Sequence, residues 1–228
     1  MADQGTWIPV TAKDGGKFEA YLTGNSGPSI VLLQEIFGIN PHIRSVADLI
    51  AAEGYRVIAP DLFWRMEPRV ELGFDQEDMQ KAFGFFGRFD AQQGIADAGA
   101  ALDQVRGNEK TGAIGFCLGG MLAYLFALHQ KPTCSVAYYP VGMANLLDQA
   151  PNLSVPLLIH FGETDEYADA GVRDNVANAL TNKSGVEIHV YEGAGHAFNN
   201  EARASGYVPE AASLAWQRTT AFFAKHLK

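Results

Sequence analysis

The chain has 228 residues, of which 47% are hydrophobic and 19% charged, a composition typical of a soluble globular protein with a sizeable core. The formal net charge of −9 disfavours nucleic acid and anionic membranes as partners, because both attract basic surfaces. No apolar run approaches the roughly 18 residues that a membrane-spanning helix needs, so no membrane span is expected.

The first residues and the two cysteines bear on the cellular compartment. The N-terminal stretch lacks the basic and apolar regions of a secretory signal, so a reducing cytoplasm is expected. Cys117 and Cys134 are therefore expected to be free thiols, although by count alone they could form one disulfide. Cys134 stands at the entry to a predicted strand and is interpreted as a small buried hydrophobe.

Hydrophobic periodicity predicts strands and helices that alternate along most of the chain. Residues 29–33 form a continuous apolar run, typical of a strand that is buried on both faces of a parallel sheet. A helix is expected to begin with Asn40 as N-cap and Pro41 at its first position, and to end at Gly54. The other expected strands are 6–10 and 17–22, paired around an Asp-Gly-Gly turn, and 55–59, 134–139, 155–161 and 186–191. The other expected helices are 75–86, 91–105, 170–180 and 209–226, with residues 61–73 left irregular.

This alternation predicts an α/β protein with a mostly parallel central sheet and helices on both faces. No repeat, low-complexity tract or break in composition interrupts the sequence, so residues 1–228 are expected to form a single domain. The last helix is expected to dock through four large apolar side chains, Leu214, Trp216, Phe222 and Phe223.

Residues 111–124 contain the clearest chemical motif. A short apolar strand pattern leads into Gly-x-Cys-x-Gly at 115–119, and good helix formers follow. This pattern is typical of the nucleophile elbow of α/β-hydrolases, with Cys117 where serine is usual. The two glycines fit this pattern because the backbone at the nucleophile is strained. The strand and the helix can pass each other only if the residues two positions before and after it lack side chains. The alternative is that Cys117 is only a small buried hydrophobe in a glycine-rich turn.

A thiol nucleophile needs a base and a residue that orients the base, and α/β-hydrolases supply an acid and then a histidine further along the chain. Asp165 follows a glycine turn after a buried strand, and His196 follows the last strand through a glycine-rich loop. Open α/β sheets bind ligands at the carboxyl ends of their strands, so Cys117, Asp165 and His196 are expected to converge. Glu163 and Asp169 remain rivals of Asp165, and a surface position remains the alternative for His196. The remaining histidines are interpreted as structural or solvated, with the strand residue His160 in the hydrogen-bonded core: His42, His129, His160, His189 and His226.

Several stretches together resemble the dienelactone hydrolase family. They are QEIFGIN (34–40), APDLF (59–63), IGFCLGG (114–120), FGETDE (161–166) and GAGHAFNN (193–200), in the family's order and spacing over most of the chain. The resemblance implies an α/β-hydrolase fold and a catalytic triad of Cys117, His196 and Asp165.

The resemblance also implies a role for Glu35. In the mechanism that it implies, the resting thiol of Cys117 is bonded to Glu35, and substrate binding moves the thiol proton to Glu35 and leaves a thiolate–imidazolium pair. A nearby carboxylate disfavours a thiolate by like-charge repulsion, whereas a helix N-terminus and His196 favour it. The alternatives are that Glu35 caps the helix region at Asn40 or pairs with Arg65.

The expected reaction is cysteine-dependent hydrolysis of a lactone or ester through a thioester acyl-enzyme. Backbone N–H groups of Leu118 and Ile36 are expected to stabilise the oxyanion, by analogy with the elbow geometry. His196 then activates water against the thioester. No metal or cofactor is expected, since the sequence has no Cys/His cluster with ligand spacing.

The sequence departs from the family where the substrate's carboxylate is held. Dienelactone hydrolase uses arginines and a tyrosine there, and alignment places Met79, Phe83 and Asn200 at those positions. Arg203 from the same loop could substitute, and Arg65 or Arg88 could contribute. A buried cleft without a cation rejects a carboxylate, so a less anionic or differently shaped ester or lactone is expected. The substrate-binding candidates are Phe37, Arg65, Met79, Phe83, Phe198, Asn200 and Arg203.

Two other functions stay open. One is a broader carboxylesterase or thioesterase acting on a neutral acyl substrate with the same triad. The other is a non-catalytic binding protein, because a fold does not fix a function. The expected partner in each case is a small molecule, and a monomer is the default.

Overall fold

The computed structural model describes residues 5–228. Contacts within the chain divide it into two compact units, Met1–Gly112 and Ala113–Lys228. Within the described part of the chain, no helix is both long and apolar enough to cross a membrane. The organisation as a single domain stays a prediction.

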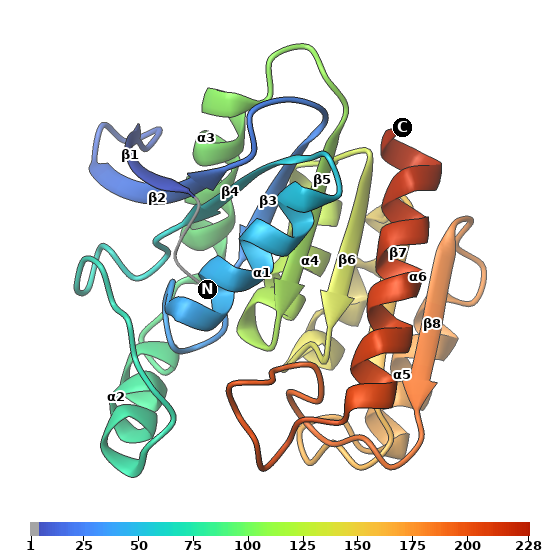
Figure 1. Ribbon diagram of the computed structural model, residues 1–228. Coiled ribbons are helices and arrows are strands. Elements are labelled where there is room, and N and C mark those ends of the chain that lie inside the picture. Colours follow the sequence, from blue (N-terminus) through green and yellow to red (C-terminus); the bar gives the residue numbers. More distant parts are fainter. Residues whose placement is uncertain (1–4) are drawn as a thin grey trace. The chain divides into compact units, whose positions relative to one another are not determined.

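The strands of the first unit are β1 (Thr6–Thr11), β2 (Lys17–Thr23), β3 (Ser29–Leu33) and β4 (Arg56–Pro60). They lie in the order β1-β2-β4-β3 (Figure 1). β1 and β2 form the expected antiparallel hairpin, β2 is antiparallel to β4, and β4 is parallel to β3. Every residue of β3 is buried, as its continuous apolar run predicts.

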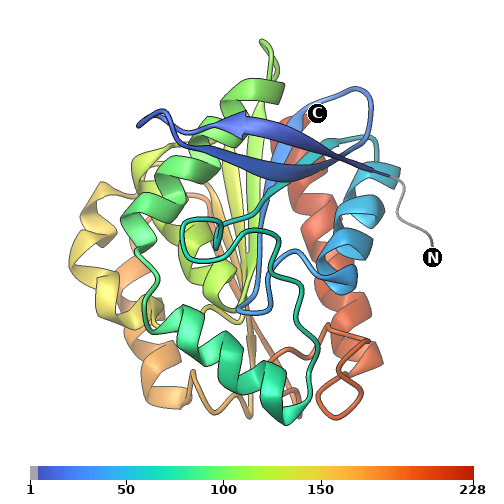
Figure 2. The same ribbon diagram turned by 90° about the vertical axis from the view of Figure 1, so that its left-hand side faces the viewer.

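Three helices belong to this unit: α1 (Pro41–Ala52), α2 (Gln76–Phe86) and α3 (Ala91–Val105). α1 covers one face of the strands and α3 the other (Figure 2). Each helix is preceded by a polar N-cap residue, and Asn40 is the N-cap that the sequence predicts for α1. The side chains of Asn40, Asp75 and Asp90 accept backbone N–H groups of the first turns, which have no partners within the helix.

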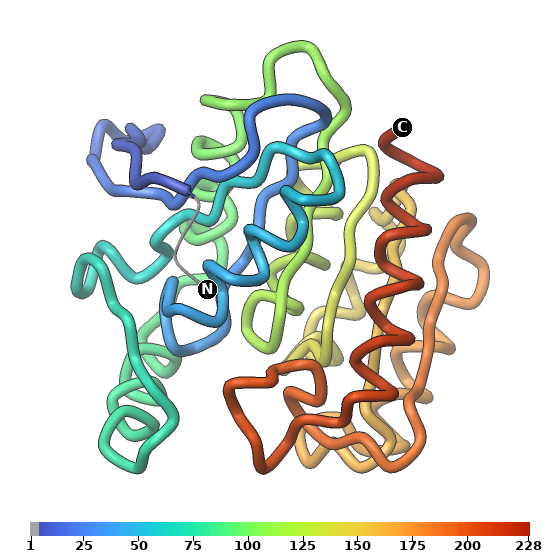
Figure 3. The backbone as a smooth tube through the Cα atoms, viewed as in Figure 1, coloured from blue at the N-terminus to red at the C-terminus, as the bar shows by residue number. Residues whose placement is uncertain are grey.

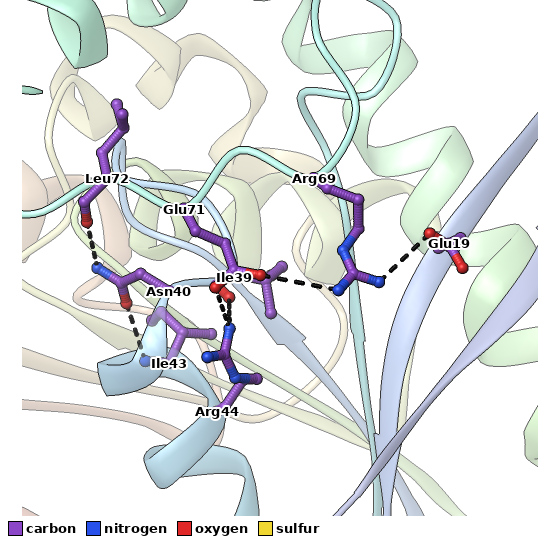
Figure 4. Close-up of polar contacts among 8 residues, drawn as sticks. All are labelled: Glu19, Ile39, Asn40, Ile43, Arg44, Arg69, Glu71 and Leu72. Carbon is purple, nitrogen blue, oxygen red and sulfur yellow. Dashed lines mark hydrogen bonds and ion pairs between the residues drawn. The ribbon is translucent and has the colours of Figure 1, made fainter. Parts of the chain in front are cut away.

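Residues 61–73, which we call the strap, have the irregular conformation that the sequence predicts, but they are fastened to the start of α1 (Figure 4). Asn40 accepts the N–H of Ile43 at 3.2 Å and donates its side-chain amide to the carbonyl of Leu72 at 3.0 Å. Leu72 in turn donates its N–H to the carbonyl of Phe37 at 2.9 Å. One side chain thus caps the helix and holds the strap.

Arg44 and Arg69 add charged bonds to the strap (Figure 4). Arg44 donates to the carbonyl of Ile39 at 2.7 Å and to the carboxylate of Glu71 at 2.6 Å. Arg69 pairs with Glu19 of β2 at 3.3 Å and with Glu71 at 3.8 Å. The loop that follows β3 is therefore bound to the strap by backbone and side-chain hydrogen bonds.

The strands of the second unit are β5 (Thr111–Phe116), β6 (Cys134–Tyr138), β7 (Leu157–Gly162) and β8 (Val186–Tyr191), in that order across the sheet. β6, β7 and β8 are parallel, so their carboxyl ends share one edge. α6 (Pro209–Leu227) covers one face, and α4 (Leu118–His129), the 3₁₀ segment η1 (Met143–Asn152) and α5 (Ala170–Leu180) cover the other (Figures 1 and 2). A long loop, residues 192–208, leads from β8 to α6 (Figure 3).

Two features of this unit differ from the sequence-based expectations. The sequence predicts no element at η1, because a 3₁₀ segment lacks the 3.6-residue period that marks an α-helix. Leu214, expected to dock α6, is 42% exposed. Phe222 and Phe223 are buried as predicted, and small residues such as Ala215 complete the buried face of α6.

The buried imidazole of His160 has two hydrogen-bond partners. His160, in β7, hydrogen-bonds through Nδ1 with the hydroxyl of Tyr191 at 2.8 Å and through Nε2 with the hydroxyl of Thr219 at 3.0 Å. Burial keeps the pKa of His160 well below its usual value, so the ring stays neutral. The prediction of a hydrogen-bonded core histidine is confirmed. Cys134 is fully buried and is not part of a disulfide, as its structural interpretation requires.

Candidate active site

Cys117 occupies the turn between β5 and α4. Its φ is 57°, in the left-handed region that residues other than glycine rarely adopt. Gly115 has no space for a side chain, because a Cβ there would overlap the backbone of Gly119. This is the strained strand–turn–helix geometry that the Gly-x-Cys-x-Gly spacing predicts.

Leu118 is the first residue of α4, and the N-cap Cys117 forms no side-chain cap hydrogen bond. The first N–H groups of a helix have no partner within the helix and carry partial positive charge. Cys117 is only 8% exposed, so this N-terminus provides hydrogen-bond donors and a favourable potential in a largely dry site.

His196 and Asp165 form a buried hydrogen-bonded pair. His196 Nδ1 lies 2.9 Å from Asp165 Oδ2, and both residues come from loops at the carboxyl ends of parallel strands. Asp165 Oδ1 accepts the N–H of Tyr167 at 2.8 Å, which fixes the carboxylate. A carboxylate bonded to Nδ1 orients the imidazole and leaves Nε2 for another partner.

The partner on the other side of His196 is Cys117, whose side chain hydrogen-bonds with the imidazole. Burial lowers the pKa of His196, but the hydrogen bonds with Asp165 and Cys117 and their charges outweigh burial and raise it to about 10. The imidazole therefore has a strong tendency to hold a second proton. Such a group can take the proton of the thiol and later return it.

The two rivals of Asp165 have other partners. Glu163 accepts the N–H of Gly193 at 2.9 Å, and Asp169 caps α5 by accepting the N–H of Val172 at 2.9 Å. The structure thus places Asp165, and neither rival, against His196.

Two tyrosines that the sequence analysis missed contact His196. The ring centroid of Tyr139 lies 5.0 Å from that of His196, and the centroid of Tyr167 lies 4.8 Å from it, with interplanar angles of 68° and 73°. Tyr139 directly follows β6, and Tyr167 comes two residues after Asp165. Their positions at carboxyl ends of strands were the available signal, but ring contacts cannot be read from spacing.

The loop 192–208 contains three predicted substrate-binding residues. Phe198 is fully buried and packs edge-on against Tyr139, with ring centroids 5.6 Å apart. Asn200 is also fully buried, and its side-chain oxygen accepts the N–H of Ala202 at 3.1 Å. Arg203 is half-buried, and its charge lowers the pKa of Tyr167 against the stronger opposing effect of burial.

The first unit contains the remaining predicted site residues. Glu35, Ile36 and Phe37 follow β3 and are all buried, and Phe37 packs against Phe74 with ring centroids 4.9 Å apart. Of the two candidates on α2, Met79 is half-buried and Phe83 is 47% exposed.

Arg65 is held by two carboxylates of the first unit. It donates from Nε and Nη2 to Asp97 at 3.0 and 2.9 Å, and from Nη1 to Asp14 at 2.8 Å. The hydrogen bonds with Asp97 raise the pKa of Arg65 above its usual range.

Within residues 5–228, no group of three or more His, Cys, Asp or Glu side chains is arranged to hold a metal ion.

The alternation of strands and helices, and the order of Cys117, Asp165 and His196 along the chain, are typical of the α/β-hydrolase fold. The family model described as the dienelactone hydrolase family matches residues 18–227. The chain belongs to this family, and it is an enzyme of the class that hydrolyses carboxylic esters and lactones.

Individual relatives support this assignment. A "putative carboxymethylenebutenolidase" of Azospirillum brasilense is 37% identical and covers 97% of this chain and 99% of its own length. A "carboxymethylenebutenolidase" of Pseudomonas sp. strain P51 is 36% identical, over 93% of this chain and 92% of its own. The crystal structure of a "putative dienelactone hydrolase" from Klebsiella pneumoniae superposes with a TM-score of 0.84 at 29% identity, over 97% of this chain and 98% of the other.

Proposed function

We propose that this protein hydrolyses a lactone or ester with Cys117 as nucleophile, His196 as general base and Asp165 as the residue that orients the base. The observation that carries the proposal is the continuous hydrogen-bonded series from Asp165 through His196 to Cys117. A thiol at a strained elbow, bonded to a histidine that a buried carboxylate orients, meets the requirements of an activated nucleophile.

The reaction proceeds in two halves. The sulfur of Cys117, as a thiolate paired with the His196 imidazolium, attacks the carbonyl carbon, and the N–H groups of Leu118 and Ile36 stabilise the negative oxygen. The C–O bond of the ester breaks, and the imidazolium gives its proton to the leaving oxygen. Water then gives a proton to His196 and attacks the thioester, the C–S bond breaks, and the acid is released as the thiol regains its proton. No cofactor takes part.

We propose that Glu35 controls the protonation of the Cys117 thiol in the resting enzyme. The assignment rests on the family resemblance, and its support here is the burial of Glu35 directly after β3. In the resting state Glu35 and the thiol of Cys117 share a hydrogen bond. Substrate binding transfers the proton to Glu35 and leaves the thiolate–imidazolium pair.

The proposed substrate is a small ester or lactone that is less anionic than a dienelactone carboxylate, or differently shaped. Met79 and Phe83 present a thioether and an aromatic ring where the family has cationic and phenolic groups. Asp97 and Asp14 already neutralise Arg65, which leaves Arg203 as the candidate to bind an anionic substituent. The broader carboxylesterase or thioesterase alternative uses the same triad and differs in the acyl group and, for a thioester, in the thiol that leaves.

We also propose that the enzyme works as a monomer in the cytoplasm. Cys117 and Cys134 are not joined in a disulfide, which fits a reducing compartment, and the triad lies within one unit of one chain. Light scattering of the purified protein tests the oligomeric state.

The test of the function compares the wild type with Cys117→Ala and Cys117→Ser on a dienelactone carboxylate and on a neutral aryl acetate. We expect turnover of the neutral ester and loss of activity in Cys117→Ala. In rapidly quenched samples of the wild type, we expect mass spectrometry to detect an acyl group bound to Cys117. Efficient turnover of the dienelactone with a low KM would refute the less anionic substrate and direct attention to Arg203. Undiminished activity of a folded Cys117→Ala variant would refute the nucleophile. No turnover of either substrate would favour a binding protein.

A further inference from the structure

The imidazole of His196 contacts two aromatic rings that differ in their exposure to solvent. Tyr139 is fully buried, and its hydroxyl donates to Asn199 Oδ1 at 2.6 Å, so this ring forms a fixed inner wall. Tyr167 meets the imidazole edge to face as Tyr139 does, but it is 44% exposed. Of the two rings in contact with His196, Tyr167 is thus the one that faces solvent.

We propose that Tyr167 is a positioning residue that holds the imidazole of His196 in line between Asp165 and Cys117 from the solvent side. The proposal rests on the proposed cysteine–histidine–aspartate chemistry, because alignment of the imidazole matters only if the imidazole transfers protons.

The backbone couples Tyr167 to the pair that it supports. One oxygen of the Asp165 carboxylate accepts the N–H of Tyr167 at 2.8 Å, and the other lies 2.9 Å from His196 Nδ1. One carboxylate therefore anchors both the backbone at Tyr167 and the imidazole of His196. Loss of the ring leaves the carboxylate in place and removes only the contact on the solvent side.

The charge state of Tyr167 suits this role. Burial and the nearby groups Glu166, Cys117 and Asp165 raise the pKa of its phenol, while Arg203 lowers it. The net shift is upward, so the ring stays neutral throughout the working range of a thiol hydrolase and does not compete with Asp165 for the imidazolium. An aromatic ring that packs against an imidazole contributes a favourable interaction in both charge states, and the interaction is stronger with the imidazolium cation.

The catalytic cycle makes this contact useful. His196 has to exchange a proton with the sulfur, then with the leaving oxygen and then with water, each within hydrogen-bond reach of Nε2. Rotation of the imidazole toward solvent would break the bond of Nδ1 with Asp165 and bring water to it. A ring on the solvent side opposes this rotation, so its loss affects proton transfer more than substrate binding.

The test compares Tyr167→Ala, Tyr167→Phe and the control Leu214→Ala on a neutral aryl acetate. Leu214 has a similar exposure, 42%, lies on α6 and is not a residue of the proposed triad. We expect Tyr167→Ala to lower kcat by about three- to tenfold while KM stays within about twofold. Tyr167→Phe restores the wild-type kcat, because the contact is made by the ring, and Leu214→Ala has no effect.

A titration of His196 by NMR gives a second readout that needs no substrate. Its midpoint, near 10 in the wild type, is expected to fall by about half to one pH unit in Tyr167→Ala and to stay unchanged in Tyr167→Phe. The proposal is overturned by a Tyr167→Ala variant with wild-type kcat and midpoint, by a change in KM alone, or by a Tyr167→Phe variant as impaired as the alanine variant. If the wild type hydrolyses no ester, the proposed function fails, and the titration still decides the role of Tyr167.

Discussion

Asp165 Oδ2 lies 2.9 Å from His196 Nδ1, and the side chains of both residues are almost inaccessible to solvent. Because water does not screen this bond, the carboxylate determines both the tautomer and the orientation of the imidazole. The pair is preorganised before any substrate arrives.

Replacement of Asp165 by asparagine is expected to reduce kcat by roughly 10²- to 10⁴-fold, since an amide cannot stabilise the imidazolium or secure its tautomer. Steady-state hydrolysis of an aryl acetate measures the effect. Glu163→Gln is the matched control, because Glu163 accepts the N–H of Gly193 and is not bonded to the histidine. An Asp165→Asn variant with the kinetics of the Glu163→Gln variant would contradict the assignment of Asp165.

The raised pKa of His196 predicts a pH dependence of stability. Its value is about 10 in the folded protein and about 6.5 in an unfolded chain, so the protonated ring stabilises the fold. This contribution is fully present below pH 6.5 and is lost progressively as the pH rises toward 10. In urea unfolding at several pH values, the stability advantage of the wild type over His196→Gln should therefore shrink between these limits. A constant difference across that range would show that the proton is not linked to folding.

The space available at two glycines predicts opposite effects when each is replaced by alanine. Gly115→Ala forces a Cβ into the backbone of Gly119, so it should lower the free energy of unfolding by about 2 kcal/mol or more and abolish activity. Gly84 lies inside α2 with open space where a Cβ would stand. Gly84→Ala should therefore stabilise the protein by about 0.5–1 kcal/mol. Urea midpoints of both variants provide the measurement, and equal shifts would refute the steric argument.

Asn40 allows the helix cap and the strap contact to be separated. Asn40→Ala removes both the bond with Ile43 and the bond with Leu72, and should cost about 1–2 kcal/mol of unfolding free energy. Asn40→Asp keeps an acceptor for the cap but loses the donor to Leu72, so it should have a smaller cost. Hydrogen exchange at the N–H of Leu72 should rise in both variants. Protection there as in the wild type would mean that Asn40 does not hold the strap.

Much of the fold followed from local patterns because those patterns reflect burial. The apolar run at 29–33 predicted a fully buried strand, and Asn40 with Pro41 predicted the start of α1. Leu214 was assigned wrongly because an apolar residue on a helix does not reveal which neighbours cover it. The 3₁₀ segment η1 lacked a period that could mark it.

The site was predictable only in part, for a related reason. Strand ends placed Cys117 and His196 at one edge, and spacing is enough for that. The choice of Asp165 over Glu163 depends on the conformation of one loop, which determines which carboxylate meets the imidazole. The contact of Tyr167 with His196 likewise depends on loop geometry and on the direction of a side chain, and neither leaves a pattern in the sequence.

The positive φ of Cys117 also bears on how the enzyme could be redesigned. The glycines on either side and the pairing of the Cys117 N–H with the carbonyl of Tyr138 fix this conformation, so it does not depend on the sulfur. The backbone of the elbow therefore fixes the direction in which the side chain at position 117 leaves the chain, whichever residue stands there. Serine, aspartate or a noncanonical amino acid at position 117 would present its functional group along the same vector, and the reaction catalysed could change while the scaffold stays the same.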